Sequence, residues 1–500
     1  MMTAMRPSAG HALSKSTFLR GLQCHKSLYL NRFHKGLRDP IDPSTQAAFD
    51  RGHDVGALAQ RLFPGGVLAR ASQPWFIREA LQRTQQLLDG GERVLYEPAF
   101  QHDGVMAYVD ILTREGAAWH LYEVKSSTGV KEIYLPDAGI QTYILRGAGL
   151  DLAGVSIIHL NNQYVRKGEL DLQQLFTVVS VLPEVEAMQG AMAEQVAELK
   201  GVLRGGQVPQ IDIGPHCTEP YDCDFIGHCW AHVPQPSVFD VARLPREQMF
   251  GLYRSGILRI EDIPADFPLN ETAQFQVDHH RSGQPSLDRR AVRAFLESLR
   301  YPLYFLDFET TNPAVPPFDG LRPYGQLPFL YSLHRKESPS GDLEHSGFLA
   351  EAGEDPRRAL AEALLGDAGV VGDVLVYSQS FEGTRIRELA EQLPGQAAGL
   401  EALGDRLRDL MEVFRQRQYY HPAMHGSYSI KAVLPALVPE LGYDDLPIAD
   451  GTAAMQAYAA LPGEPDPDRA EQIRQELWDY CQRDTLAMVR ILEALQELNH

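Results

Sequence analysis

The chain has 500 residues, of which 44% are hydrophobic and 9% aromatic, enough for about two to four domains with folded cores. Its formal charge of −20 argues against a surface that binds nucleic acid throughout, but net charge does not exclude local basic patches. No apolar run approaches the roughly 18 residues of a membrane span, and no continuous apolar segment of the secretory type opens the sequence. We therefore expect a cytoplasmic protein without a membrane partner, in which thiols stay reduced.

Residues 14–38 form the first distinctive segment, because they contain six lysines and arginines and no acidic residue. Phenylalanine and tyrosine are interleaved with these basic residues. One interpretation is a solvated helix face, and the other is a surface that follows the phosphates of a nucleic acid. On the second interpretation, the binding residues are Lys15, Arg20, Lys26, Arg32 and Lys35.

Residues 45–90 show the apolar periodicity of helices, and short segments rich in β-branched and aromatic residues follow them. The predicted strand segments are residues 93–100, 104–113, 119–127 and 155–162. A helix is expected at 135–149, between the third and fourth of these segments, and a long helix at 180–204. This order of strands and helices predicts an α/β domain.

Two of these strand segments contain the first group of chemically informative residues. Alternation places Asp110 on the face opposite Val109, and it places Glu123 and Lys125 on one shared face. Two carboxylates on adjacent strands can hold a divalent cation that polarises a phosphodiester, while a lysine positions water or stabilises developing charge. The alternative is an ordinary surface pair across two strands.

Three cysteines, Cys217, Cys223 and Cys229, are each separated by five residues in a loop-rich segment. The chain contains only five cysteines. In a reducing compartment, such a cluster more often holds a metal than a disulfide.

A wider pattern connects these residues. Asp110 is followed, after a gap of twelve residues, by the E-V-K triplet, and then by a predicted helix that contains Gln141 and Tyr143. This pattern resembles the RecB-like branch of the PD-(D/E)XK nucleases, which includes the iron–sulfur nucleases of CRISPR adaptation and AddB-type helicase–nucleases. The resemblance implies that Asp110 and Glu123 bind metal and that Lys125 assists the attacking water. It also implies that Gln141 and Tyr143 support the geometry of substrate and metal.

Iron–sulfur members of that branch hold a four-iron cluster with one early and three late cysteines. The resemblance therefore implies a 4Fe–4S site made by Cys24, Cys217, Cys223 and Cys229. Four thiolates also suit zinc. The C-x5-C-x5-C spacing lacks the C-x2-C pair usual for zinc, which favours iron–sulfur, but it also differs from the C-x2-C-x5-C spacing commoner in the family.

The chain departs from the RecB-like pattern at two further positions. The proline usual before the first acid is Val109 here, and the stretch RGHDVG has Gly56 where a metal-binding histidine is expected. His53, three positions earlier, or Glu97 could complete the site, although a histidine at position 53 also fits a helix surface.

A proline-punctuated stretch marks a boundary near residue 234, and a mainly helical module follows it. The apolar strand YPLYFLDFET then places Asp307 and Glu309 on one face. Near the C-terminus, Asp484 falls inside the apolar stripe of an amphipathic helix, and Tyr480 precedes it by one turn. Acids in such positions are costly unless they are paired or bound to metal.

The chain contains, in order, a D-x-E motif, a middle acid and a Y-x3-D motif. This arrangement resembles that of the DEDDy exonucleases of the RNase H-like fold, which include polymerase proofreading domains. The resemblance implies that two Mg²⁺ or Mn²⁺ ions are held by Asp307, Glu309, Glu382 and Asp484, and that Tyr480 orients the attacking water. Glu382 replaces the usual aspartate, and Asp409 is the fallback ligand. We interpret Cys481 as a packing residue, and Lys431 either as a contact to a nucleic acid strand or as a helix-start residue.

These patterns predict an α/β protein with three parts. They are a RecB-like PD-(D/E)XK domain at 1–234, a helical linker module at 235–298 and a DEDDy RNase H-like exonuclease domain at 299–500. We expect a Mg²⁺- or Mn²⁺-dependent nuclease with two sites that acts on DNA, single-stranded or at duplex ends, in repair or antiviral defence. RNA is not excluded. The alternative is a nucleic-acid-binding or sensing protein in which one or both sites are degenerate.

Overall fold

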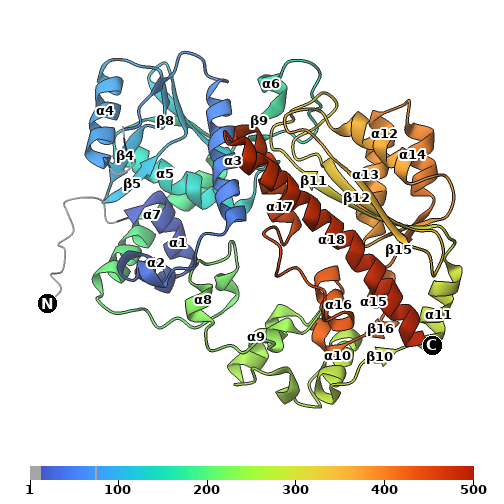
Figure 1. The fold of residues 1–500 in the computed structure, drawn as a ribbon. Helices are drawn as coiled ribbons and strands as arrows, with labels where there is room; N and C mark the ends of the chain where they lie inside the picture. Colours follow the sequence, from blue (N-terminus) through green and yellow to red (C-terminus); the bar gives the residue numbers. More distant parts are fainter. Residues whose placement is uncertain (1–12, 72, 74–75, 500) are drawn as a thin grey trace. The chain divides into compact units, whose positions relative to one another are not determined.

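The computed structural model describes residues 13–71, 73 and 76–499, and it confirms a mixed α/β fold with several sheets (Figure 1). The chain divides into two compact units. Unit 1 comprises Met1–His232 and Ala314–Tyr324, and unit 2 comprises Val233–Pro313 and Gly325–His500. In the part of the chain that is described, no helix combines the length and apolar character that crossing a bilayer requires.

Unit 1 is built on a six-stranded sheet with the order β2-β3-β6-β7-β8-β9. Its strands are β2 (Val67–Leu68), β3 (Val94–Tyr96), β6 (Ile111–Glu115), β7 (Ala118–Lys125), β8 (Leu152–Leu160) and β9 (Phe176–Ser180). β6 and β7 are antiparallel, whereas β7 and β8 are parallel. β8 is buried along almost its whole length, which suits Val155, Ile157 and Ile158 because a strand covered on both faces needs apolar side chains in both directions.

A second, three-stranded sheet in unit 1 has the order β1-β5-β4, with β1 (Leu13–Ser14), β4 (Ala99–His102) and β5 (Val105–Tyr108). The segments 93–100 and 104–113, each predicted as one strand, are therefore each divided between two sheets. The first break falls at Glu97 and Pro98, where Glu97 has a positive φ of 51° and proline has no N–H to continue a ladder. The second break falls at Val109 and Asp110, immediately before β6.

The helices of unit 1 position the residues of interest around the two sheets. They are α1 (Lys15–Gln23), α2 (His25–Phe33), α3 (Pro43–Gln60), α4 (Ile77–Asp89), α5 (Leu135–Gly147), α6 (Leu172–Leu175), α7 (Leu182–Arg204) and α8 (Ile226–Cys229). The side chains of Ser14 and Thr17 form a capping box at the start of α1. α5 packs between β8 and α7, and its buried residues include Asp137 and Gln141.

Unit 2 contains a five-stranded mixed sheet with the order β13-β12-β11-β14-β15. The strands are β11 (Leu303–Thr311), β12 (Leu327–Lys336), β13 (Leu343–Leu349), β14 (Asp373–Val376) and β15 (Leu407–Asp409). β11 is central, antiparallel to β12 and parallel to β14. Its side chains alternate between two cores, because Leu303 and Phe305 face one and Tyr304 and Leu306 face the other.

Helices cover both faces of this sheet. The two cores contain residues from α12 (Arg357–Asp367), α13 (Gln379–Gln392) and α14 (Ala397–Gly404) on one face, and from α16 (Ile430–Leu437), α17 (Gly451–Ala460) and α18 (Pro467–Asn499) on the other. The long helix α18 packs along β11 and β12 (Figure 1). The alternation of β11 therefore directs the odd-numbered acids, Asp307 and Glu309, toward the face that α18 covers.

Residues 235–298 belong to unit 2 and are mainly helical. They form α9 (Arg246–Arg254), α10 (Glu271–Ser282), α11 (Arg289–Ser298) and the short strand β10 (Ser286–Leu287), which pairs with β16 (Tyr419–Tyr420). α15 (Glu412–Arg415) precedes β16. A small apolar core made by residues such as Val238, Ile260 and Val277 stabilises the first part of this module.

Candidate active sites

The first group of functional residues lies where β6, β7 and α5 of unit 1 meet. Asp110 directly precedes β6, and Glu123 and Lys125 occupy the end of β7. Asp137 and Gln141 lie one turn apart on α5, so both project from the same face of the helix. We call these five residues, together with Lys15 at the start of α1, the first site.

Hydrogen bonds and ion pairs join the members of the first site around Glu123, which is 2% exposed. Its Oε1 accepts hydrogen bonds from Lys15 Nζ at 2.9 Å and from Lys125 Nζ at 2.7 Å. Its Oε2 accepts a hydrogen bond from Gln141 Nε2 at 2.7 Å. The same two ammonium groups contact the carboxylate of Asp137, Lys125 at 2.6 Å and Lys15 at 3.1 Å. Two carboxylates, Glu123 and Asp137, thus share two lysines.

The two acids predicted as metal ligands in this site have opposite protonation preferences. Burial and the nearby charge of Glu123 raise the pKa of Asp110 to about 7, although its Oδ2 accepts a hydrogen bond from the Val124 N–H at 2.7 Å. Burial would also raise the pKa of Glu123, but Lys125 and Lys15 outweigh it and hold that pKa below its ordinary value. Glu123 is therefore an ion-paired carboxylate, whereas Asp110 can take up a proton near neutral pH.

Sequence reasoning missed Asp137 and the true position of Lys15. Asp137 precedes Gln141 by four residues, and this helical spacing was the available signal. Lys15, predicted as a nucleic-acid contact, lies inside the first site, where it donates to Glu123. Tyr143 is not brought to the site, because its hydroxyl donates to Asp103 Oδ2 at 3.4 Å.

The proposed additional ligands also lie apart from the group around Glu123. Glu97 forms an ion pair with Arg70 at 3.2 Å, although its N–H donates to the Asp110 carbonyl at 3.1 Å. His53 is exposed on α3. At Gly56, on the same helix, a Cβ atom would meet nothing within 4 Å, so space for a larger side chain exists there.

A pocket of about 620 Å³ in unit 1 has Lys125 in its wall. Its lining is completed by the polar loop 126–129, Val130, Lys131 and three tyrosines, Tyr134, Tyr221 and Tyr324. The Tyr324 hydroxyl donates a hydrogen bond to the Ser126 carbonyl. The pocket therefore combines hydroxyl groups, cationic groups and aromatic rings next to one residue of the first site.

The four cysteines expected to hold a cluster line a single small cavity of about 20 Å³. Cys24 caps the N-terminus of α2, Cys217 ends the 3₁₀ helix Pro215–Cys217, and Cys229 ends α8. The backbone N–H of Ser27 donates to Cys24 Sγ at 3.5 Å, and Cys223 Sγ donates to the Ser27 hydroxyl at 3.4 Å. We call the four residues the cysteine cluster.

The spacing of the sulfur atoms in the cysteine cluster bears on which group they fit. No three of these four described thiols have sulfur atoms that all lie within 4.8 Å of one another. A tetrahedral zinc site with bonds of about 2.3 Å brings its sulfur atoms to about 3.8 Å. An iron–sulfur cluster holds its thiolates further apart, because iron and sulfide ions lie between them. The donor set of four thiols fits both groups.

An ion pair and a hydrogen bond next to the cysteine cluster engage two of the other basic residues predicted to bind nucleic acid. Arg20 donates to Asp224 Oδ1 at 2.5 Å and to Oδ2 at 2.9 Å. Lys26 Nζ donates to the Ile211 carbonyl at 3.3 Å. These contacts fasten α1 and α2 to the segment that contains the late cysteines. Arg32 and Lys35 are exposed.

The second group of functional residues lies on the α18 face of the unit 2 sheet. Asp307 and Glu309 come from β11, Glu382 from the first turn of α13, and Tyr480 and Asp484 from α18. These residues line one cavity of about 420 Å³. We call these five residues the second site. All five predicted residues are thus brought together, although they are separated by up to 177 positions, from 307 to 484, in the sequence.

Within the described residues, none of the four carboxylates of the second site forms an ion pair with lysine or arginine. Asp484 instead accepts a hydrogen bond from the Tyr443 hydroxyl at 2.6 Å and another from Tyr480. The Oε2 atom of Glu382 is buried and has no hydrogen-bond partner. Tyr443 was not identified from the sequence, because it lies 41 residues from Asp484 and only tertiary packing brings the two together.

Burial and mutual repulsion shift the acids of the second site toward their protonated forms. Burial and then the charge of Asp484 raise the pKa of Glu309 to about 8, against the opposing effect of Lys431. Burial and Asp409 raise the pKa of Glu382 to about 8. The pKa of Asp307 lies well above its ordinary range, because of burial followed by the charges of Asp484 and Glu309.

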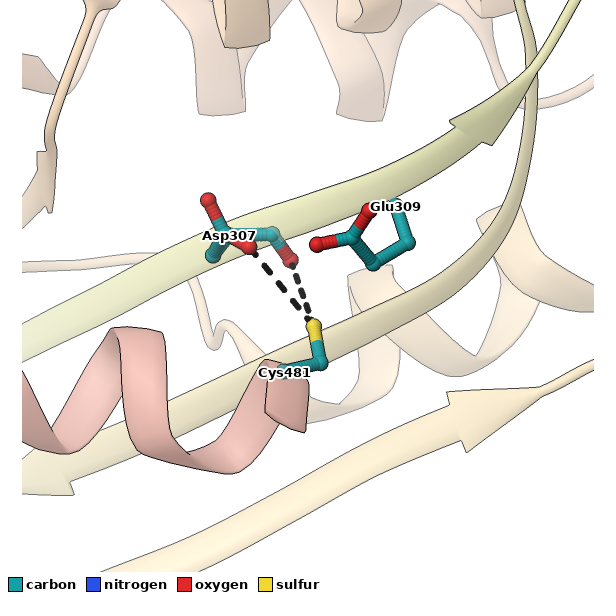
Figure 2. A group of neighbouring side chains, drawn as sticks. All are labelled: Asp307, Glu309 and Cys481. Atoms are coloured by element: carbon teal, nitrogen blue, oxygen red, sulfur yellow. Dashed lines mark hydrogen bonds between the residues drawn. The ribbon is translucent and has the colours of Figure 1, made fainter. Parts of the chain in front are cut away.

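Cys481, interpreted from the sequence as a packing residue, is fully buried and belongs to the core between α18 and the sheet. Its sulfur also lies 3.7 Å from Asp307 Oδ2 (Figure 2). One ligand atom each from Asp307, Glu309 and Cys481 lies within 4.8 Å of the other two. The thiol therefore borders the carboxylates as well as packing in the core.

The remaining sequence candidates lie around the second site. Asp409, the fallback ligand, is the last residue of β15 and accepts a hydrogen bond from the Met411 N–H at 3.0 Å. Its carboxylate therefore binds the backbone that follows the strand. Lys431 donates to the Ala449 carbonyl at 2.6 Å. Its ammonium group also lies 5.4 Å from the ring centres of both Tyr443 and Tyr480.

Comparisons with known proteins name no activity for this chain. Residues 304–429 match a family model described as a domain of unknown function, DUF2779. This segment contains Asp307, Glu309 and Glu382, and it ends before Tyr480 and Asp484. The chain is also similar to the uncharacterized protein UU173 of Ureaplasma parvum serovar 3, with 23% identity over 245 residues. That match covers 44% of this chain and 34% of the relative.

Proposed function

We propose that this protein is a Mg²⁺- or Mn²⁺-dependent nuclease with two active sites. The observation that carries the proposal is the second site, in which three buried carboxylates, the half-buried carboxylate of Asp307 and a tyrosine line one cavity without a basic ion-pair partner among the described residues. Such crowding is unfavourable unless cations enter, and hard divalent cations prefer carboxylate oxygens.

In the second site, two divalent ions would be held by Asp307, Glu309, Glu382 and Asp484. These ions would polarise the phosphodiester and provide an activated water. The Tyr480 hydroxyl, on the helix turn before Asp484, would orient that water. Tyr443 positions Asp484 through its short hydrogen bond. The central position of Asp307 and Glu309 in a mixed sheet supports an RNase H-like exonuclease unit of the DEDDy type, acting from the 3′ end.

In the first site, Asp110 and Glu123 would hold a metal ion, and Lys125 would stabilise the developing charge. Gln141 and Lys15 fix the orientation of the Glu123 carboxylate. The antiparallel pairing of β6 with β7, followed by α5 over the sheet, supports a PD-(D/E)XK-like unit. Asp137 competes with Glu123 for Lys125 and Lys15, so it tunes the charge of this site.

The cysteine cluster would hold a 4Fe–4S group, with zinc as the alternative. Its role in the proposal is structural, because Cys24 from α2 and the three late cysteines come from opposite ends of the unit 1 sequence. A shared group would cross-link those ends, as metal binding does in other small domains.

DNA is the proposed substrate, by the resemblance of both units to DNA nucleases, and RNA is not excluded. The pocket beside Lys125 supports a nucleic acid strand as ligand, because its tyrosines offer stacking surfaces and Lys131 offers a phosphate contact. Repair and antiviral defence are both compatible with such an activity.

One observation favours a second candidate, a nucleic-acid-binding protein whose first site is degenerate. Lys15 and Lys125 already neutralise Glu123 and Asp137 without any metal. The position of Gly56, where the RecB-like pattern expects a histidine, agrees with this alternative.

End-labelled single- and double-stranded DNA and RNA, incubated with anaerobically purified protein, Mn²⁺ or EDTA, test the proposal. We expect Mn²⁺-dependent shortening from the 3′ end that Asp484→Asn removes, and a separate cleavage pattern that Lys125→Ala removes. Asp479→Asn, an exposed acid on the same helix, and Lys167→Ala, an exposed lysine of unit 1, are the matched controls. Tight binding without cleavage of any substrate would contradict the proposal and favour the binding protein.

A further inference from the structure

The side chains of Asp307, Glu309 and Cys481 converge on one point between β11 and α18 (Figure 2). The two carboxylates project from the strand, and the thiol projects toward them from the helix. The four-acid arrangement proposed for the nuclease does not use this thiol. Cys481 is also separate in sequence and position from the cysteine cluster, because it belongs to unit 2.

The distance between the carboxylate and the thiol suits a tetrahedral cation. An ion held at about 2.1 Å from a carboxylate oxygen and about 2.3 Å from a sulfur, in tetrahedral geometry, separates those two atoms by about 3.6 Å. Asp307 Oδ2 and Cys481 Sγ are 3.7 Å apart. Little movement of either side chain is therefore needed to bind such an ion.

A second observation in the same cavity points to a cation. Glu382 is 3% exposed and lines the cavity, and its Oε2 atom has no hydrogen-bond partner. A buried carboxylate oxygen without a donor is costly, and a nearby cation removes that cost. A cation in this cavity would therefore also lower the cost of the unpaired Glu382 carboxylate.

The chemistry of the donor set distinguishes between cations. Mg²⁺ takes oxygen ligands in octahedral geometry, whereas Zn²⁺ and its analogues take mixed oxygen and sulfur ligands in tetrahedral geometry. A site that adds a thiol to two carboxylates therefore favours a thiophilic ion over Mg²⁺. This preference comes from Cys481 alone, since the four acids on their own would favour hard ions.

We propose that Asp307, Glu309 and Cys481 form a binding site for a thiophilic divalent cation, of which Zn²⁺ is the biological example. Because the two carboxylates are shared with the second site, Zn²⁺ competes with Mg²⁺ or Mn²⁺ there and inhibits cleavage. The binding site stands on the geometry of the three side chains, and only the inhibition depends on the proposed nuclease function.

Co²⁺ titration of the full chain tests the binding site, because a thiolate bound to Co²⁺ gives a charge-transfer band in the near ultraviolet. The cysteine cluster contributes equally to wild type and Cys481→Ser, so the difference between their spectra reports Cys481. We expect a difference band, wild type minus Cys481→Ser, whose amplitude saturates with one additional equivalent of Co²⁺. Zn²⁺ affinity, measured by competition with a chelator, should fall at least about 100-fold in Cys481→Ser. Identical spectra and affinities would overturn the proposal.

Glu309→Gln provides a second test that retains the thiol. The three-residue site predicts that this variant also loses the difference band, and a band that persists would show that the thiol binds Co²⁺ without the carboxylates, which overturns the site as proposed. Circular dichroism checks that both variants fold.

Inhibition is measured separately, as the Zn²⁺ concentration that halves the Mn²⁺-dependent cleavage of each protein relative to its own uninhibited rate. It should rise about 100-fold in Cys481→Ser, and an unchanged value would overturn competition at this site. If no protein cleaves any substrate, the nuclease proposal fails, but the Co²⁺ result still decides the binding site.

Discussion

The two carboxylate sites of this protein differ in how the negative charge of their buried acids is compensated. In the first site, Lys15 and Lys125 neutralise the buried Glu123 and Asp137 directly. In the second site, the described residues include no such ion pair, and burial and repulsion raise the pKa values of the acids instead. Among the described residues, Asp110 is the acid of the first site without an ion-pair partner, whereas all four acids of the second site lack one and gain stability from protons or cations.

This difference shows what burial of an acid does and does not indicate. A buried carboxylate with lysines within hydrogen-bonding distance can be a structural ion pair, and on its own it is weak support for metal binding. A group of buried carboxylates with raised pKa values and an unpaired oxygen is stronger support, because the protein itself does not stabilise their charge. The second site is therefore the better candidate for an active metal centre.

The largest effect is expected from breaking the ion pairs of the first site. Glu123→Gln leaves Lys15 and Lys125 with Asp137 as their only carboxylate partner, and loss of one member of a buried ion pair costs about 3–5 kcal/mol. Hydrogen exchange of β7 and α5 should accelerate accordingly in the metal-free protein. Glu115→Gln, an exposed acid at the end of β6, is the control. Unchanged exchange in Glu123→Gln would show that the lysines contribute little there.

Addition of Mn²⁺ should stabilise the second site more than the first, and we expect this change in stability to be somewhat smaller than that caused by Glu123→Gln. At 100 times its dissociation constant, Mn²⁺ stabilises a protein that binds it by about 2.7 kcal/mol. We expect slower hydrogen exchange in β11 and α18 and a smaller change in β7, because the lysines already occupy the carboxylates of the first site. Asp484→Asn should reduce the protection of α18 by Mn²⁺. Equal protection of both units would remove the contrast between the sites.

The stability of metal-free unit 2 should depend on pH in a defined direction. Glu309 and Glu382 have ordinary pKa values of 4.5, which the fold raises to about 8. The folded state therefore binds more protons than the unfolded state between those values, and the stability of unit 2 falls as pH rises from about 4.5 to about 8.

Thermal unfolding and hydrogen exchange of unit 2 at pH 5, 7 and 9 measure this loss. A loss of 1 kcal/mol corresponds to about 2–4 °C in a unit of this size. Glu309→Gln resembles the protonated acid, so it should flatten the dependence, and Mn²⁺ should flatten it as well. A stability that rises across this range would contradict the raised pKa values.

Local patterns in the sequence were sufficient to locate most of the second site. Period-two alternation placed Asp307 and Glu309 on one face of β11, and an acid inside an apolar helical stripe identified Asp484. Tyr480 followed from its spacing to Asp484. These residues are recognisable because each one conflicts with the apolar pattern around it.

The missing parts of both sites depend on contacts that no local pattern specifies. Lys15 meets Glu123 across 108 positions, and Tyr443 meets Asp484 across 41. Tyr143 was assigned to the first site by the resemblance to RecB-like nucleases, but it lies two positions from Gln141, and two positions along a helix rotate a side chain by about 200°. Cys481 looked like a packing residue because it is one, and only the structure shows that its sulfur also borders Asp307.

The smallest effect concerns the aromatic pocket of the first site. Tyr324→Ala removes a ring from the wall of the pocket that contains Lys125, and base stacking on one aromatic ring is worth about 1–3 kcal/mol. Because the neighbouring Tyr134 and Tyr221 remain, we expect the lower end, a weakening of about 5- to 10-fold. Fluorescence anisotropy of a labelled single-stranded oligonucleotide in EDTA measures this affinity without cleavage.

Tyr324→Phe separates the ring from the hydroxyl that bonds the Ser126 carbonyl. If stacking is the reason for the effect, the phenylalanine variant binds like wild type and the alanine variant binds more weakly. If both variants lose affinity equally, the hydroxyl acts by holding the loop 126–129 in place. The tyrosine then shapes the pocket, and no base stacks on its ring. Since the second site has no part in this pocket, Asp484→Asn should leave this effect of Tyr324→Ala unchanged, and a changed effect would show that the two sites share one binding surface.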